Sequence, residues 1–264
     1  MTLEMWPSPA AIAHRGSRYL WPENTMEAFS GAISMGFRHV ETDLHQTSDG
    51  VLVLVHDDTV DRTTDATGRV SDYTFAELSQ LDAGYRHGPA RTHQFRGKGI
   101  RIPSLEELLT TFPEIGVVVD LKTVGLAEPL SALLDRLDAH DRLIVGSFDD
   151  RRLVEFREST SGRVATSSGT GLSRSWYVGS RIGRAPRGDA RALQLPRTRR
   201  GLTVVDRRLV ESAHRHGVLV HVWTINDPAE MHQLLDLGVD GLVTDRPDLL
   251  KSVLIDRGEW KGPT

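Results

Sequence analysis

Short apolar segments, many of them rich in valine, alternate along the chain with stretches that have the periodicity of amphipathic helices. Most of these segments are apolar at consecutive positions, as strands of a parallel sheet covered by helices are. The predicted strands are residues 11–14, 39–44, 51–56, 115–122, 143–148, 163–167, 192–195, 218–224 and 241–244. The predicted helices are residues 25–35, 104–111, 126–139, 150–159, 206–216, 228–237 and 247–256.

The repeated order of strand then helix predicts an α/β protein, and it favours a closed eight-stranded parallel barrel over a doubly wound sheet. No Gly-x-Gly-x-x-Gly segment opens a helix after the first predicted strand, which counts against the doubly wound alternative. The chain has 264 residues, and we predict that residues 1–264 form one barrel domain.

One region breaks the alternation. Residues 58–99 are polar and rich in glycine, arginine and threonine, with one predicted helix at 74–81. We interpret them as an insertion between a strand and the next barrel helix. Loops of this kind, at the carboxyl ends of barrel strands, shape substrate sites.

The composition excludes several classes of function. The formal net charge of −4 argues against general nucleic-acid binding. The absence of cysteine excludes disulfides, zinc–thiolate sites and thiol nucleophiles. No segment is long enough to span a bilayer, and the first ten residues lack the pattern of a secretory signal, so a cytoplasmic enzyme is predicted.

Four charged residues lie near the ends of two predicted strands. Glu41 and Asp43 are two positions apart and therefore share a face of their strand, as do Asp120 and Lys122. Three carboxylates that converge at the rim of a barrel would repel one another unless a cation neutralised them. Oxygen ligands favour Mg²⁺ or Ca²⁺ over zinc, so one of these ions is the predicted cofactor.

Two histidines end predicted strands close to these acids. His14 and His56 could act on a bound phosphodiester, one removing a proton from the attacking oxygen and the other protonating the leaving oxygen. Arg15 offers a forked cation suited to phosphate, and Lys122 a point charge that could stabilise a developing negative oxygen. The other histidines, including His221, are predicted to pack or to face solvent.

These motifs resemble the glycerophosphodiester phosphodiesterase family over about residues 11–250. The matching segments are His14-Arg15-Gly16, Pro22-Glu23-Asn24-Thr25, Glu41-Thr42-Asp43, Thr47-Ser48-Asp49-Gly50, His56-Asp57, Arg62-Thr63-Thr64, 102–108, Ser147-Phe148, Val222-Trp223-Thr224-Ile225-Asn226 and 238–247. Each motif is weak alone, but together they are specific.

The resemblance implies a TIM barrel with a small insertion after the second strand, at about residues 57–100. It implies hydrolysis of a glycerophosphodiester to an alcohol and sn-glycerol 3-phosphate through a cyclic phosphate. His14 and His56 fall on the catalytic histidines of the family, and Arg15 and Lys122 on its basic residues near the phosphate. The metal carboxylates of the family fall on Glu41, Asp43 and Asp120.

Asp120 departs from the family pattern, which usually has glutamate at that place. Aspartate is one methylene shorter, so Asp120 would bind a metal through a water or from a closer backbone. A second reading of the same site is lysophospholipase D-type activity on lysophospholipids. The secreted relatives with that activity carry disulfides, which this chain cannot form.

For several further residues the sequence predicts supporting roles. Trp223 is predicted to line the substrate pocket, with barrel packing as the alternative, and Arg62 to brace the insertion. Asn24 is predicted to cap a helix, and a role for Glu23 in orienting active-site groups is left open as an alternative. His45 shares the strand face of Glu41 and Asp43, but a role as ligand is disfavoured.

The segment from Arg174 to Arg200 holds eight arginines and one acid, Asp189. A solvated face is the simpler interpretation, and peripheral contact with anionic lipid is the alternative. The oligomeric state is left open by the sequence.

Overall fold

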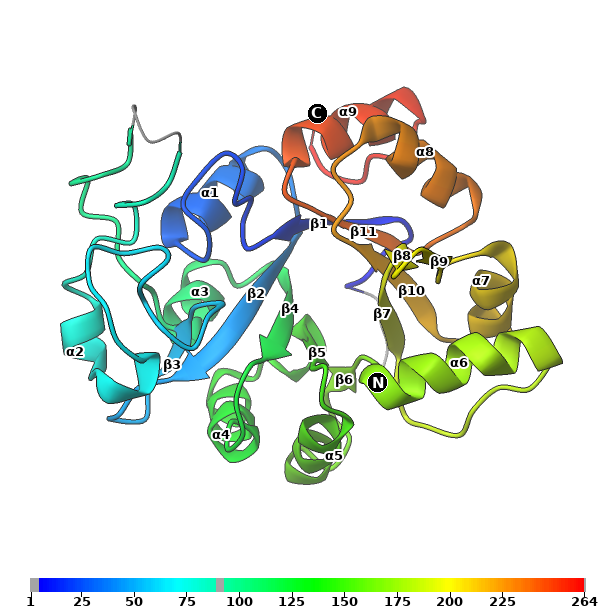
Figure 1. The fold of residues 1–264 in the computed structure, drawn as a ribbon, viewed down its shortest axis with the longest axis horizontal. Helices are drawn as coiled ribbons and strands as arrows, with labels where there is room; N and C mark the ends of the chain where they lie inside the picture. The colour runs from blue at the N-terminus through cyan, green and yellow to red at the C-terminus, as the bar shows by residue number, and fades with distance from the viewer. Residues whose placement is uncertain (1–4, 89–92, 264) are drawn as a thin grey trace.

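Eight parallel strands form the wall of a nearly closed barrel in the computed structural model, which describes residues 5–88 and 93–263 (Figure 1). In spatial order they are β6 (Ala165–Thr166), β5 (Leu143–Gly146), β4 (Gly116–Leu121), β2 (His39–Gln46), β1 (Ala10–His14), β11 (Gly241–Thr244), β10 (Leu219–Trp223) and β7 (Ala192–Pro196). A parallel bridge between Ser167 and Ala192 brings β6 and β7 together. The predicted α/β barrel is confirmed.

Helices cover the outside of the barrel (Figure 1). They are α1 (Met26–Ser34), α3 (Leu105–Thr111), α4 (Ala127–Leu137), α5 (Asp150–Ser159), α6 (Thr170–Ile182), α7 (Arg207–His214), α8 (Pro228–Asp236) and α9 (Pro247–Asp256). Short 3₁₀ turns lie at Val70–Asp72 and His140–Arg142. Side chains that accept from the first-turn amides start several helices, for example the reciprocal Ser104–Glu107 capping box of α3.

Helix α6 is absent from the sequence-based prediction, which left this region as a basic loop-and-helix face. Its sequence holds glycine and serine at several positions and begins after Gly169 without a side-chain cap, so its local signal is weak. Packing supplies what local propensity lacks: Trp176, on the inner face of α6, is buried in the main core.

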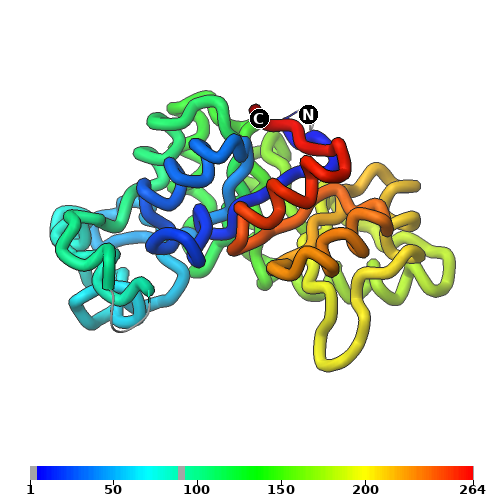
Figure 2. The backbone as a smooth tube through the Cα atoms, turned by 90° about the horizontal axis from the view of Figure 1, so that it is seen from above, coloured from blue at the N-terminus to red at the C-terminus, as the bar shows by residue number. Residues whose placement is uncertain are grey.

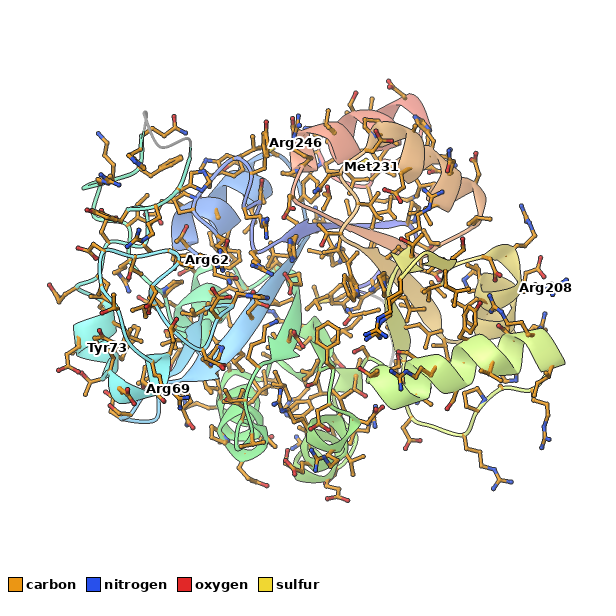
Figure 3. All side chains as sticks on the ribbon, in the orientation of Figure 1. Arg62, Arg69, Tyr73, Arg208, Met231 and Arg246 are labelled. Atoms are coloured by element: carbon orange, nitrogen blue, oxygen red, sulfur yellow. The ribbon has the colours of Figure 1, made fainter. Side chains whose placement is uncertain are left out.

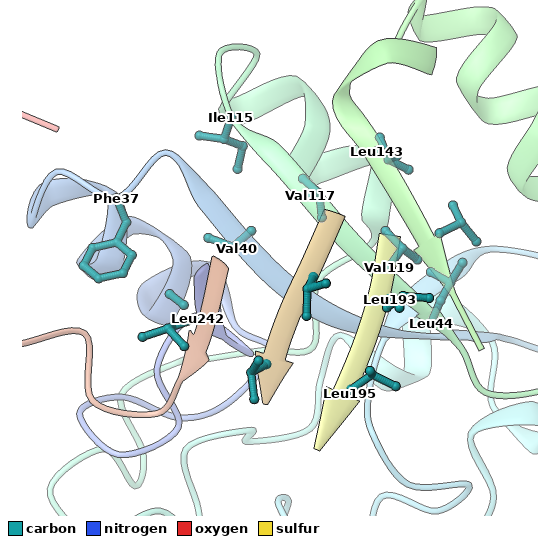
Figure 4. Packing of buried hydrophobic residues seen from close by; sticks show 14 of the residues in the cluster. Phe37, Val40, Leu44, Ile115, Val117, Val119, Leu143, Leu193, Leu195 and Leu242 are labelled. Carbon is teal, nitrogen blue, oxygen red and sulfur yellow. The ribbon is translucent and has the colours of Figure 1, made fainter. Parts of the chain in front are cut away.

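The strands bury both faces, as their sequence predicted. The outward-facing residues of the wall, among them Val40, Val117 and Leu193, pack beneath the helices (Figure 4). A second cluster, including Ile12, Val118, Ile144 and Val243, fills the barrel interior. The period of two along each strand therefore separates two cores, one inside the barrel and one outside it.

The amino ends of the strands are closed by aromatic side chains. The ring of Trp6 lies 4.7 Å from that of His39 and 5.9 Å from that of His221. His221 is fully buried, and His39 nearly so, its Nε2 lying 2.5 Å from the carbonyl oxygen of Met5. This end of the barrel is a packed plug, so any site has to open at the other end.

The predicted strand at residues 51–56 proved to be wrong as a barrel strand. Only Leu52–Leu54 (β3) is a strand, and it runs antiparallel to the end of β2, with Leu54 paired to Leu44. His56 therefore follows β3 in a loop. The physical reason is that β2 extends two residues beyond the wall and offers a free edge, which β3 fills.

The insertion has its own small core. Val53, Val60, Val70, Leu78 and Ile100 are buried together beside the barrel. The predicted helix at 74–81 is shorter, α2 (Phe75–Leu78), and it starts from a Thr74–Glu77 capping box.

Two projections flank the open end of the barrel. The insertion lies on one side, and α6 with a hairpin of β8 (Thr198–Arg199) and β9 (Leu202–Thr203) lies on the other (Figures 1 and 2). Within the part of the chain that the structure describes, no helix is both long and apolar enough to cross a membrane.

Candidate active site

A cleft with a volume of about 1060 Å³ opens at the carboxyl ends of the strands. All the residues predicted to form the site line it: His14, Arg15, Glu41, Asp43, His56, Asp120, Lys122 and Trp223. The first seven gather on the side of β1, β2 and β4, which we call the charged half. Parallel strands end at the same rim of a barrel, so residues far apart in sequence meet there.

His14 is held by a carboxylate at the end of the last strand. Its Nδ1 lies 2.6 Å from Oδ1 of Asp245, and since a carboxylate only accepts, Nδ1–H is the donor. Asp245 also accepts from the side chain of Asn226 at 3.0 Å. The other ring nitrogen of His14, Nε2, is directed into the charged half, 3.7 Å from Glu41. It carries a lone pair suited to a proton acceptor.

His56 has the same arrangement in a different local structure. Its Nδ1 lies 2.5 Å from Oδ1 of the adjacent Asp57. Asp57 accepts in turn from Nε of Arg62 at 2.6 Å. Both predicted acid–base histidines therefore have Nδ1 engaged by a carboxylate, which fixes ring orientation and tautomer.

Asp43 is the most heavily compensated acid of the site. It accepts from Nδ2 of Asn24 at 2.9 Å, and it pairs with Nζ of Lys122 at 2.8 Å and with Nε of Arg15 at 3.0 Å. Burial opposes its ionisation, but the charges of Arg15 and Lys122 outweigh burial and hold the pKa of Asp43 below its usual value.

Glu41 lies in the opposite electrostatic state. Burial, and then repulsion from Asp43, raises the pKa of Glu41 to about 7. Its nearest partners are the amide of Arg15, which donates at 3.2 Å, and the ring of His14. At this carboxyl the protein's own positive charges do not offset burial.

Asp120 and Lys122 adjoin each other at the end of β4. Nζ of Lys122 donates to Oδ2 of Asp120 at 2.6 Å and also reaches Asp43, so the ammonium group bridges two predicted metal ligands. Burial still raises the pKa of Asp120. Within residues 5–88 and 93–263, no three His, Cys, Asp or Glu side chains are already grouped as a metal site.

The chemistry of the donor set nevertheless suits a divalent cation. Three carboxylates line one cleft, and burial together with repulsion from Asp43 raises the pKa of Glu41 despite the nearby positive charges. Oxygen donors of this kind match Mg²⁺ or Ca²⁺. For all three to bind one ion, the Lys122 ammonium would have to leave its place between Asp43 and Asp120.

A chain of ion pairs ties the charged half to the insertion. Arg15 donates to Glu23 at 2.8 Å, and both oxygens of Glu23 accept from Arg62 at 2.8 Å (Figure 3 labels Arg62). Arg62 and Arg15 hold the pKa of Glu23 at about 2 despite burial. Arg62 thus braces the insertion, as the sequence predicted, and Glu23 orients Arg15, a role that the sequence had left open.

The structure also shows where Asn24 and His45 lie. The predicted helix cap Asn24 is wrong: the cap of α1 is Thr25, which accepts from the amide of Ala28. Asn24 instead has φ of 55°, which asparagine tolerates, and its amide binds Asp43. His45 is buried beside the backbone of His56 and does not line the cleft.

The rest of the cleft, which we call the outer half, comes from the other side of the barrel. It is lined by Phe148, Arg174, Tyr177, Arg199, Arg200, Leu202 and Trp223. The rings of Trp223 and Phe148 meet edge to face at 5.8 Å. Trp223 therefore lies on a cleft wall, where the sequence placed it.

The structure adds positioning residues to those predicted. Asp245 and Asp57 support the two histidines, and Asn226 supports Asp245. Asp245 could have been found from the rule that selected His14, because it directly follows the last barrel strand. Its sequence separation of 231 residues from His14 hides the contact until the barrel closes.

Comparison with known proteins places the chain in one family. The model of the "Glycerophosphoryl diester phosphodiesterase family" matches residues 14–249. A Mycobacterium tuberculosis protein named "Probable glycerophosphodiester phosphodiesterase 2" is 38% identical over 261 residues, covering 96% of this chain and 93% of the relative.

Solved structures agree in fold. The glycerophosphoryl diester phosphodiesterase domain of another M. tuberculosis protein superposes with a TM-score of 0.82 at 22% identity, covering 94% of this chain and 99% of that one. An Oleispira antarctica phosphodiesterase, solved with the product sn-glycerol-3-phosphate, has a TM-score of 0.75 at 27% identity, covering 94% and 97% of the two chains. This chain belongs to the glycerophosphoryl diester phosphodiesterase family.

Proposed function

We propose that this phosphoric diester hydrolase cleaves glycerophosphodiesters to an alcohol and sn-glycerol 3-phosphate, with His14 and His56 as the acid–base pair. The observation that carries the proposal is that the rings of His14 and His56 have the same surroundings. Each lines the same cleft, and each has Nδ1 beside a carboxylate, so that Nε2 is left for proton transfer. The product found in the O. antarctica relative is the product expected here.

The reaction proceeds in two balanced steps. One histidine accepts the proton of the neighbouring glycerol hydroxyl as its oxygen bonds to phosphorus. The other histidine donates a proton to the departing alcohol oxygen as the P–O bond breaks, which leaves a cyclic phosphate. Water then opens the ring with the two histidines in exchanged roles, so both return to their starting protonation.

Arg15 is the group placed to orient the phosphate. Its guanidinium is held on two sides by Glu23 and Asp43, so it is ordered before substrate binds. A forked cation in a fixed position lowers the energy of a phosphorane-like transition state because it needs no reorganisation.

The reaction is proposed to depend on a divalent metal. Glu41, Asp43 and Asp120 would hold Mg²⁺ or Ca²⁺, which when bound supplies Lewis-acid stabilisation of negative charge on the phosphate. The burial of Glu41 beside Asp43, which raises the pKa of Glu41 and which a cation would offset, supports this assignment. Lys122, displaced from between Asp43 and Asp120, would then be available to the substrate phosphate.

The deciding experiment measures release of sn-glycerol 3-phosphate from glycerophosphocholine and glycerophosphoethanolamine. It is run with Mg²⁺, Ca²⁺, Mn²⁺ or EDTA, beside His14→Ala and His56→Ala. We expect metal-dependent release that both substitutions abolish. Release that persists in EDTA would reject the metal, and no release from any diester would reject the function. A cytoplasmic location stays a prediction from the sequence.

A second candidate activity is hydrolysis of lysophospholipids at the same site. The observation in its favour is the apolar mouth of the outer half, where Phe148 is 60% exposed and Leu202 52% exposed. Such side chains can cover an acyl chain. Assays of one head group with and without an acyl chain separate the two activities.

A further inference from the structure

The outer half of the cleft has an unbalanced positive charge. Arg174 on α6 and Arg199 and Arg200 on the hairpin line it and are exposed. None of the three forms a salt bridge or side-chain hydrogen bond within the described part of the chain. Arginines without partners in a cleft wall are free to bind a ligand anion.

Two neighbouring arginines of the same segment are paired with acids instead. Arg197 pairs with Glu230 at 3.0 Å, and Arg181 pairs with Asp206 at 2.7 Å. Neither lines the cleft. The arginine-rich segment is therefore not one uniform basic face: two of these arginines are paired, three border the cleft, and Arg184, Arg187 and Arg191 are exposed away from it.

The acids of the cleft do not offset these three charges. The carboxylates that line it are Glu41, Asp43 and Asp120, all in the charged half, and Asp43 and Asp120 are already paired with Arg15 or Lys122. A group that occupies the outer half consequently meets arginine, aromatic, aliphatic, hydroxyl and amide side chains, and no carboxylate. The electrostatic potential there disfavours a cation and favours an anion.

The position of the outer half identifies which part of a substrate it meets. If the phosphorus lies between His14 and His56, the attacking glycerol hydroxyl lies beside one of these histidines, and both line the charged half. The rest of the diester then extends into the outer half, which is the open side of the same cleft.

We propose, on the basis of that function, that Arg174, Arg199 and Arg200 select diesters whose alcohol moiety carries its own negative charge, such as a second phosphate. Choline and ethanolamine head groups are cationic and are disfavoured at this place. The shared chemistry is an anionic alcohol, whether the diester is water-soluble or carries an acyl chain.

The test compares two substrates that differ by one phosphate, glycerophosphoinositol and glycerophosphoinositol 4-phosphate, with glycerophosphocholine as the cationic reference. We expect kcat/KM to rank the phosphate-bearing diester first and the choline diester last. Monoacyl forms of the two inositol substrates show whether the preference extends to lipids.

The variant is the triple substitution Arg174→Ala, Arg199→Ala and Arg200→Ala. It should lower kcat/KM for the phosphate-bearing diester about tenfold, mainly through KM. For glycerophosphoinositol, whose inositol moiety carries no charge, kcat/KM should change less than about twofold. Added salt should reduce the wild-type preference, because exposed charges are screened. Arg187→Ala is the matched control, an exposed arginine that does not line the cleft.

The outcomes separate this inference from the function beneath it. Equal kcat/KM for the two inositol diesters, or an equal loss on all substrates in the triple variant, overturns the anion preference while leaving the enzyme a phosphodiesterase. A preference for the choline diester overturns it too. No hydrolysis of any diester rejects both.

Discussion

Histidines stand at both ends of this barrel, and their surroundings are opposite. At the open end, His14 has a carboxylate, Asp245, 2.6 Å from Nδ1, and its Nε2 faces the cleft. At the closed end, His221 is fully buried beside Trp6, and neither of its ring nitrogens has a hydrogen-bond partner in the described chain. Burial lowers the pKa of His221 to about 4.

The comparison shows that the chemistry of a histidine depends on the groups that surround its ring. A carboxylate on one nitrogen and an open cleft on the other are the surroundings that a proton-transferring histidine needs. A sealed apolar environment produces a neutral ring that acts as a packing group and is sensitive to acid. Four predictions test the proposed roles of these groups.

The largest effect is expected at the open end. His14→Ala and His56→Ala should each lower kcat about a thousandfold, because general acid–base catalysis contributes roughly 10²–10⁴. The measurement is steady-state hydrolysis of glycerophosphocholine with metal present, with circular dichroism to verify folding. His221→Leu is the matched control and should keep activity near that of the wild type. A comparable loss in that control would contradict the division of roles.

Asp245→Asn tests whether the carboxylate gives His14 its role. The amide group of Asn226 donates to this position, so it would hold the new amide oxygen and turn the new NH₂ group toward His14. Nδ1 would then accept, and the proton would move to Nε2. We expect kcat to fall about a hundredfold with little change in KM and an altered pH profile. Unchanged kcat and pH profile would show that Asp245 is only structural.

His221 should make the fold sensitive to acid. Above pH 6.5, the ordinary histidine pKa, His221 is neutral in both the folded and the unfolded chain, and its contribution to the free energy of unfolding is complete. As the pH falls toward about 4, the unfolded chain takes up a proton at this histidine and the folded chain does not, so that contribution is lost. Between pH 7 and 4.5 the resulting loss in the free energy of unfolding is about 2 kcal/mol, judged from the pKa difference between the folded and the unfolded chain.

His221→Leu should remove that part of the pH dependence, measured by urea denaturation at both pH values. His232→Leu, on helix α8 outside the barrel interior, is the control and should leave the pH dependence as in the wild type. If His221→Leu is as acid-sensitive as the wild type, the buried ring is not the cause.

The smallest effect is expected at Asp120. Asp120→Glu should retain or slightly improve the affinity for metal, because the longer side chain extends further toward the other carboxylates. The measurement is the metal concentration that gives half-maximal activity, together with calorimetric titration of Mn²⁺. A large loss of activity with folding intact would count against Asp120 as a ligand.

Much of this molecule could be predicted before any coordinates. The alternation of doubly apolar strands with helices indicated the barrel, and the placing of His14, Glu41, Asp43, Asp120 and Lys122 at strand ends indicated the cleft rim. Both follow from local rules, since the period of two and the strand-then-helix order act over a few residues.

Two predictions were wrong because they depend on tertiary contacts, which a local sequence pattern does not contain. The role of residues 51–56 was misjudged because an apolar run does not reveal the direction of its partner, which the free edge of β2 decides. Helix α6 went unpredicted because tertiary packing of Trp176 outweighs its weak local propensity.

Residue types and short spacings in the sequence are enough to indicate the fold class, the family and the side chains proposed for the site, because these patterns act locally. The charges and the contacts of those groups, in contrast, depend on the tertiary structure. The pairing of His14 with Asp245, the bridge from Lys122 to Asp43 and Asp120, and the raised pKa of Glu41 all depend on contacts between segments remote in sequence. Burial and electrostatics are properties of distance in space, and only the closed barrel sets those distances.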